Sequence, residues 1–455
     1  MKRIGTIFLV FTLIIATGMI GSISALGAGE DFNWRQFEGT TIVINFPVHL
    51  AHNKWIELIP EFEEKTGIKV EIDQIYYMRM HDKQLLELGK PVGDYDVIVI
   101  VGPLWKTEYV TAGYLTPLEP FIEDPQLTFP EYDFDDFIDA YVDVQGKVCL
   151  DCKGTDIYLG GGPDTETYIY AVPASSETSI FAYRKDLFEK YNLEVPDTWD
   201  EVAELAKFFY ENVPGVYGLT MRGEVGHQAG AAWLNFADPF GAKIFDENWE
   251  PAFTSEESIE VLYFIKEMVK YGPPGIPGFS VGAADNAFLQ GQAALYFDHS
   301  RIAGLVRDPE QSKVVGKVGY AITPKKKNRL AETGGFGVAI AANSQNKEAA
   351  WLFITWMTSK EVEKRLAKAG VQLTDRLSIL MDPELQEMFA EYKVIAQQEP
   401  DPNWRPAIAE FSLIETQYFG VAVNQVMTGE KSPEEAMQSI VEPIRKIMEE
   451  GGYYD

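Results

Sequence analysis

Residues 96–101 begin with one aspartate and continue as an unbroken run of apolar side chains, 97–101, which ends at Gly102. A strand inside a parallel sheet is covered on both faces and has this pattern, whereas a half-exposed strand alternates. Shorter strand patterns precede it at 41–46 and 68–72, and between them residues 55–65 place apolar side chains on one face of a helix. This strand–helix–strand order predicts an α/β fold with a parallel sheet.

The second half of the chain is mainly helical before it returns to strands. Ser/Thr-x-x-Glu boxes, or close variants of them, mark helix starts at Thr198, Thr254 and Ser432. Further strand patterns lie at 317–322 and 337–341. Strand building therefore stops and resumes along the chain, which is consistent with a fold of two lobes.

The first residues have the composition of an export signal. Lys2 and Arg3 precede an apolar stretch at 7–20, and small residues follow to Gly29. We expect residues 1–28 to be a signal peptide, because this apolar stretch is shorter than the roughly 20 residues of a membrane span. An uncleaved anchor is the alternative. No cysteine lies near the cleavage region for lipid attachment, so we expect a soluble periplasmic or extracellular protein.

Composition restricts the class of partner. The formal charge of −30 argues against nucleic acid and anionic lipid, since binding either needs clustered Lys and Arg. After removal of the signal, about 425 residues remain, enough for two domains. We expect a monomer with no cofactor and no metal.

The only cysteines are Cys149 and Cys152, followed by a glycine-rich segment. A lone C-x-x-C is compatible with a redox pair, half of a zinc site or a local disulfide. No second pair and no nearby histidine completes a metal set. For an exported chain we predict the disulfide.

Several motifs stand in series along the chain, at 168–173, 181–188, 196–201, 293–298, 337–340, 346–351, 356–360 and 428–436. In these motifs and their order the chain resembles the family 1 extracellular solute-binding proteins of ABC sugar importers, which are similar to maltose-binding protein. The stretch at 222–249 is most similar to the sorbitol/mannitol-binding branch, although that branch has tryptophans where this chain has Gly334, Gly335 and Phe336.

The resemblance implies a two-lobed periplasmic-binding-protein fold (type II) with the ligand in the cleft between lobes. Lobe one would contain residues 30–174 and 325–372, and lobe two residues 175–324 and 373–455. It implies a receptor that passes a carbohydrate or polyol to ABC permease subunits at the membrane. Monosaccharide, oligosaccharide and polyol ligands remain open.

Ligands of open α/β sheets bind beyond the carboxyl ends of strands, and sugars need planar polar groups with an aromatic platform. In lobe one this favours His49 after the first strand and Trp105 after the central one. Trp105 is interpreted as the platform, with core packing as its alternative, and His49 as a ligand contact or a helix cap. Tyr77 and Phe336 are further candidates, with a surface tyrosine and core packing as their alternatives.

In lobe two, Arg222 and His227 lie in a glycine-containing loop after the strand pattern at 217–220. An arginine fork suits paired hydroxyls or a carboxylate, and a solvated loop arginine is the alternative for Arg222. Asp298 follows a strand pattern, where it could accept two hydroxyl protons or cap the next helix. Glu177 follows the expected crossing between lobes, where it contacts ligand or pairs with a cation.

Two motifs suggest catalysis, and we assign neither of them that role. Residues 278–282 match G-x-S-x-G, but prolines precede them where that motif needs a strand. Asp133, Asp135 and Asp136 lack the glycine of a calcium loop. We therefore expect that this protein is not an enzyme. The alternatives are a secreted glycan-active enzyme, or a binding protein that serves a chemoreceptor or sensor kinase.

Overall fold

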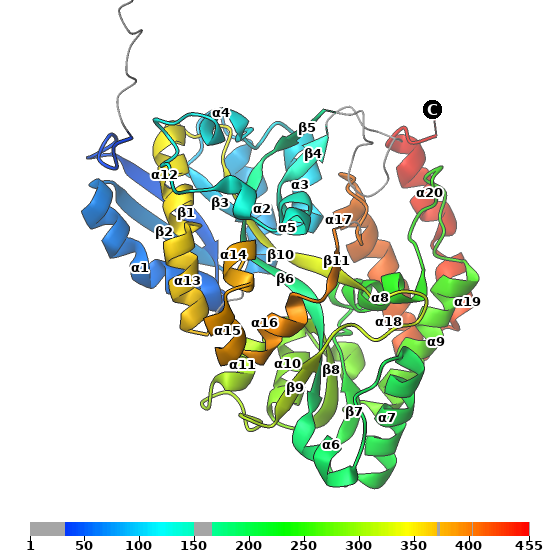
Figure 1. Cartoon of the computed structure of the whole chain (residues 1–455). Helices are drawn as coiled ribbons and strands as arrows, with labels where there is room; N and C mark the ends of the chain where they lie inside the picture. The colour runs from blue at the N-terminus through cyan, green and yellow to red at the C-terminus, as the bar shows by residue number, and fades with distance from the viewer. Residues whose placement is uncertain (1–31, 150–165, 371–373, 403, 455) are drawn as a thin grey trace, which may run out of the picture. The chain divides into compact units, whose positions relative to one another are not determined.

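A computed structural model of the chain describes residues 32–149, 166–370, 374–402 and 404–454. Its main feature is a mixed sheet with the strand order β2-β1-β3-β10-β6-β8-β7, in which β11 also pairs with β10 and β9 with β6. β6 and β10 run through the middle of this sheet (Figure 1). Its strands are β1 (Thr41–Pro47), β2 (Lys69–Ile75), β3 (Val97–Ile100), β6 (Ala171–Arg184), β7 (Tyr217–Thr220), β8 (Ala293–His299), β9 (Val318–Ala321), β10 (Leu330–Ile340) and β11 (Glu399–Asp401); a separate pair is formed by β4 (Lys147–Cys149) and β5 (Thr167–Ile169).

The first three strands confirm the predicted parallel sheet. β1 pairs in parallel with β2 on one side and with β3 on the other. All four residues of β3 are buried, as expected for a strand covered on both faces. The α/β class predicted from this run is therefore confirmed.

β6 and β10 connect two halves of the sheet. The beginning of β6, residues 171–173, pairs with residues 337–339 of β10, which in turn pairs with β3. Farther along, residues 179–183 of β6 pair with β8. Pairing with β10 continues to Thr178, so the change of partner falls between residues 178 and 179, a few residues after the predicted lobe boundary at residue 174. The lobe boundaries themselves stay a prediction.

The backbone is unusual just before this change of partner, where the register between β6 and β10 shifts. Ser175 has φ +73°, which side-chain-bearing residues seldom adopt, and Gly335 opposite has φ +91°. A Cβ on Gly335 would lie 2.4 Å from the Ser175 carbonyl oxygen, so only glycine fits there. The Asp375 carboxylate accepts the N–H groups of Ser175 and Ser176 at 2.8 and 2.7 Å. These contacts hold the crossing in one conformation.

Helices cover the sheet and begin largely where the sequence predicts. Thr198 and Ser432 form complete capping boxes, whereas the helix expected at Thr254 is capped by Ser255. Figure 1 shows α1, α12 and α13 on the side of β1 and β2, and α7 and α9 near β7. The helices are α1 (Leu50–Thr66), α2 (Met80–Leu88), α3 (Gly102–Thr111), α4 (Glu119–Ile122), α5 (Asp139–Gln145), α6 (Lys185–Tyr191), α7 (Trp199–Asn212), α8 (His227–Phe240), α9 (Glu256–Tyr271), α10 (Val281–Leu289), α11 (Ile302–Arg307), α12 (Lys347–Met357), α13 (Lys360–Lys368), α14 (Leu377–Leu380), α15 (Pro383–Met388), α16 (Ala390–Ile395), α17 (Phe411–Ile414), α18 (Gly420–Met427), α19 (Pro433–Gln438) and α20 (Val441–Glu450).

Buried tryptophans form hydrogen bonds between neighbouring helices. The Trp55 indole N–H donates to the Met357 carbonyl at 3.0 Å, which joins α1 to α12. Trp233 is buried and donates to the Ser258 carbonyl at 3.3 Å, which joins α8 to α9. A buried indole needs such an acceptor because an unpaired donor is costly away from water.

Two predictions fall on residues outside the described ranges. The signal peptide at 1–28 is one, and the disulfide is the other, because Cys149 ends β4 but Cys152 is not described. Both stay predictions. Within the described ranges, no helix is long and apolar enough to cross a membrane.

Candidate functional site

A cavity of about 380 Å³ lies at the carboxyl ends of the strands. Residues that follow β1, β2, β3, β7 and β11 line it, together with parts of β6, β8 and β10. The start of α10 closes another side with residues 280–282. This is the position at which open α/β sheets bind ligands.

The cavity gathers most of the residues that the sequence predicts for the site. Their sources are loops and strands that are far apart in the chain, which explains why only the strand-end rule could group them. Their roles toward a ligand stay predictions. The predicted residues that line the cavity are His49, Tyr77, Glu177, Arg222, His227 and Phe336.

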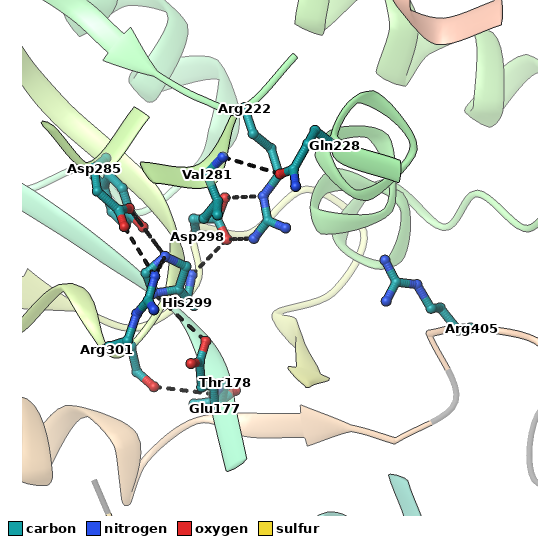
Figure 2. Close-up of polar contacts among 12 residues, drawn as sticks. Glu177, Thr178, Arg222, Gln228, Val281, Asp285, Asp298, His299, Arg301 and Arg405 are labelled. Atoms are coloured by element: carbon teal, nitrogen blue, oxygen red, sulfur yellow. Dashed lines mark hydrogen bonds and ion pairs between the residues drawn. The ribbon is translucent and has the colours of Figure 1, made fainter. Parts of the chain in front are cut away.

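Asp298 lies behind the cavity as the partner of Arg222. Arg222 Nε donates to Asp298 Oδ2 at 2.7 Å, and the second guanidinium nitrogen contacts Oδ1 (Figure 2). The His299 N–H also donates to Oδ1 at 2.8 Å. Burial would raise the pKa of Asp298, but the Arg222 charge outweighs it and holds this pKa below its usual value. Asp298 therefore orients Arg222, which differs from the expected direct contact with two ligand hydroxyls.

Arg301 is paired in the same way. Its guanidinium donates to Asp285 Oδ2 at 3.2 Å. The other oxygen of Asp285 accepts from the Tyr296 hydroxyl at 2.8 Å and contacts His299 Nε2 at 3.1 Å (Figure 2). Burial would raise the pKa of Asp285, yet His299 and Arg301 lower it, so the carboxylate is ionised.

A third arginine faces the cavity from a different segment. Arg405 follows β11, and Figure 2 shows it on the opposite side from Arg301. Its guanidinium donates to the buried Glu415 at 2.7 Å, and His227 Nδ1 contacts the other oxygen of Glu415 at 3.1 Å. Burial lowers the pKa of His227, so its imidazole is neutral at pH 7.

Two glutamates supply carboxyl groups to the cavity, and no arginine of the described residues is bonded to either of them. Glu177 comes from β6 and Glu332 from β10. With its nitrogen turned toward the carboxyl, the Asn235 amide donates to Glu332 Oε1 at 2.9 Å. Burial raises the pKa of Glu332 to about 8, and Asp298 adds to this against the attraction of Arg222. Glu332 therefore offers both a donor and an acceptor at neutral pH.

Aromatic rings form the apolar part of the lining. Phe336 packs against His49 with ring centroids 5.1 Å apart, and against Tyr77 at 6.3 Å. Trp404 lines the cavity beside Arg405, and its indole N–H donates to the Thr333 carbonyl. Such rings suit the C–H face of a sugar or polyol.

The structure places Trp105 elsewhere. It lies in α3, buried, with its ring 5.3 Å from His81 and 6.3 Å from Tyr109. It lines a second cavity of about 340 Å³ that shares His227 with the first. The Gly-Pro pair that precedes it begins this helix, where Pro is favoured in the first turn. The role of Trp105 as a ligand platform stays a prediction.

The G-x-S-x-G match has no nucleophile geometry. Ser280 is the N-cap of α10 and accepts the N–H of Ala283 at 3.3 Å. A 3₁₀ turn, Ile276–Gly278, precedes it in place of a strand. The motif is therefore a helix start at the rim of the cavity.

Sequence reasoning missed several lining residues. Tyr76 adjoins a predicted residue, and Arg301 and His299 follow the predicted strand ending near Asp298, so the strand-end rule could have included them. Trp404 and Arg405 follow a three-residue strand that pairs with β10, and no local pattern predicts that pairing.

The chain is similar to proteins that carry polyol names. It is 30% identical to the mannitol-binding protein of Pseudomonas aeruginosa over 392 residues, which are 79% of this chain and 82% of that protein. It is 25% identical to the erythritol/L-threitol-binding protein of Mycolicibacterium smegmatis over 407 residues, 85% of this chain and 80% of that protein.

Solved structures show the same architecture. The ABC transporter solute-binding protein of Agrobacterium radiobacter in complex with ribitol has a TM-score of 0.79 and 27% identity, covering 90% of this chain and 99% of that one. The solute-binding protein of Agrobacterium vitis with bound D-mannitol has a TM-score of 0.75 and 26% identity, covering 91% and 100%. The predicted two-lobed α/β fold is thereby confirmed.

A sequence model of the bacterial extracellular solute-binding protein matches residues 51–364, which is more than half of the chain. The resemblance found in the sequence motifs is therefore confirmed, and the chain belongs to the family of bacterial extracellular solute-binding proteins.

Proposed function

We propose that this protein is an exported receptor that binds a carbohydrate or polyol in the cavity and delivers it to the permease of an ABC transporter. The observation that carries the proposal is the pairing of every cavity arginine with a buried carboxylate: Arg222 with Asp298, Arg301 with Asp285, and Arg405 with Glu415.

This pairing favours an uncharged ligand with many hydroxyls. Each guanidinium is held in place and keeps free N–H groups, but its charge is already balanced. The neutral His49 and His227 add no positive charge, because burial lowers both pKa values. A net positive cavity would favour a phosphate or carboxylate ligand, and this cavity has no such excess. Hydroxyl groups need only donors and acceptors in several directions, which the lining supplies.

The names of the relatives narrow the class of ligand. Mannitol, erythritol, L-threitol and ribitol are open-chain polyols in the names of relatives and solved neighbours. A cavity of about 380 Å³ is at the small end of the range for ligand sites. A small polyol is therefore the first ligand to test.

We further propose that closure of two lobes traps the ligand, with β6 and β10 as the connection. The side-chain amide of Gln228, at the start of α8, donates to the Tyr77 hydroxyl at 3.1 Å. The oxygen of the same amide accepts the backbone N–H of Val281 at 3.2 Å. In the expected division, Tyr77 belongs to lobe one and Gln228 to lobe two, so this bond would join the lobes when they close.

Release without chemical change completes the proposal, since Ser280 caps a helix and is not positioned as a nucleophile. A thermal-shift screen against polyols, monosaccharides and disaccharides, followed by calorimetric titration, tests binding. The ligand recovered after long incubation should be unchanged by chromatography. Sustained release of a product would contradict the receptor, and so would the absence of any binding ligand.

A further inference from the structure

Glu177 lies between two imidazoles that reach it from different elements. His49, which follows β1, places Nε2 3.8 Å from Glu177 Oε1. His299, at the end of β8, places Nδ1 3.7 Å from Glu177 Oε2 (Figure 2). Both separations are too long for hydrogen bonds. The three side chains line the cavity, and the imidazoles are almost fully buried.

The two nitrogens that face Glu177 are buried without a hydrogen-bond partner in the part of the chain that the structure describes. The other nitrogen of each ring is occupied, because His49 Nδ1 contacts His52 Nδ1 at 3.3 Å and His299 Nε2 contacts Asp285 at 3.1 Å. Native structures seldom leave buried polar atoms unpaired. A ligand atom in each gap would satisfy them.

We infer that Glu177, His49 and His299 form a subsite that recognises two hydroxyl groups on adjacent carbon atoms. A hydroxyl oxygen about 2.8 Å from a carboxylate oxygen and from an imidazole nitrogen fits a gap of this width. Each hydroxyl donates its hydrogen to one oxygen of Glu177, and its oxygen accepts the N–H of one imidazole. Because the two oxygens of one carboxylate are close together, hydroxyls on neighbouring carbons can bind both of them at once.

The backbone holds this carboxylate at the crossing between the halves of the sheet. Glu177 pairs with Gly334 of β10, and its neighbour Ser176 is bonded to Asp375. In the proposed division His49 belongs to lobe one and His299 to lobe two. The diol is therefore bound from both lobes, and this inference rests on the proposed function.

The test is calorimetric titration with ribitol and D-mannitol. Glu177→Gln keeps the size of the side chain but makes one of its two acceptors a donor. We expect its affinity for the polyols to fall about tenfold or more, because buried groups lose their partners. The melting temperature without ligand should stay within about a degree of wild type. Glu61→Gln, on the exposed surface, is the control and should bind normally.

A second measurement uses only the wild-type protein. Pentane-1,2,5-triol and pentane-1,3,5-triol have equal numbers of carbons and hydroxyls, but only the first has adjacent hydroxyls. The first should displace bound ribitol at lower concentration. Equal displacement by both triols would overturn the inference, as would Glu177→Gln binding both polyols within about twofold of wild type. If the wild-type protein binds neither polyol, the polyol proposal fails first, and the inference fails with it.

Discussion

Replacing Asp298 by asparagine isolates the charge that orients Arg222. The two side chains are 2% and 10% exposed, so the pair is buried. Asparagine keeps the shape of aspartate, but it turns an amide N–H₂ toward a guanidinium that can only donate. Removing one partner from a buried pair costs about 3–5 kcal/mol, since the remaining charge is uncompensated. We expect Asp298→Asn to lower the free energy of unfolding by about 3 kcal/mol.

The control is an exposed arginine–carboxylate pair that is also joined by two hydrogen bonds. Arg365 donates to both oxygens of Glu61 at 2.8 Å, and these side chains are 43% and 52% exposed. Water screens such a pair, so Glu61→Gln should cost less than about 1 kcal/mol. Both pairs have two hydrogen bonds between the guanidinium and the carboxylate, and they differ strongly in burial.

Urea unfolding of the ligand-free variants measures both effects, and calorimetric titration adds affinity for the polyol found by screening. We expect Asp298→Asn to lose affinity about tenfold or more, because Arg222 is no longer held at the cavity wall. A double variant, Arg222→Met with Asp298→Leu, should recover stability but not binding. If Asp298→Asn is no less stable than Glu61→Gln, the reasoning on this buried pair is wrong.

Three other predictions concern pH, packing and the cysteines. Between pH 4.5 and 8 the folded protein holds a proton on Glu332 that the unfolded chain releases, so the contribution of Glu332 to stability falls as pH rises. The Tm of Glu332→Gln should therefore rise relative to the Tm of wild type from pH 5 to 9. A constant Tm difference over this pH range would refute this. Trp105→Ala should lower the ligand-free Tm by several degrees, because removing a buried tryptophan costs about 3–5 kcal/mol; an unchanged Tm with weaker binding would contradict this and support the platform role. Thiol titration of the denatured, unreduced protein should find neither Cys149 nor Cys152 free, and two reactive thiols would refute the disulfide.

Local patterns predicted the elements well where the determinants are local. The apolar run of β3 and the capping boxes at Thr198 and Ser432 depend on neighbouring residues, and all three are confirmed. The prediction for β10 was too short, because the strand begins at Leu330 and not at Gly337. Gly334 and Gly335 interrupt the strand pattern, since glycine has low strand propensity and no side chain to show alternation.

The position of the cavity was predictable from the sequence, but the ion pairs around it were not. The strand-end rule found His49 and Arg222, because a strand and the loop after it are visible in the sequence. It could not show that Asp298 pairs with Arg222, 76 residues away, because that contact depends on how β7 and β8 align. Arg405 was missed for a similar reason, because the long-range pairing of β11 with β10 positions its segment. Long-range pairing of charges leaves no local pattern.

Filling the cavity with a side chain tests the location of the binding site most directly. Gly282 lines the cavity in the first turn of α10, and a Cβ there has only Ser280 Oγ within 4.0 Å. Gly278 lies four residues earlier, with open space around its Cβ, and is not part of the cavity lining. We expect Gly282→Phe to abolish calorimetric binding of the polyol that wild type binds, with an unchanged ligand-free Tm, while Gly278→Phe binds normally. Full binding by Gly282→Phe would contradict the central claim that the ligand occupies this cavity.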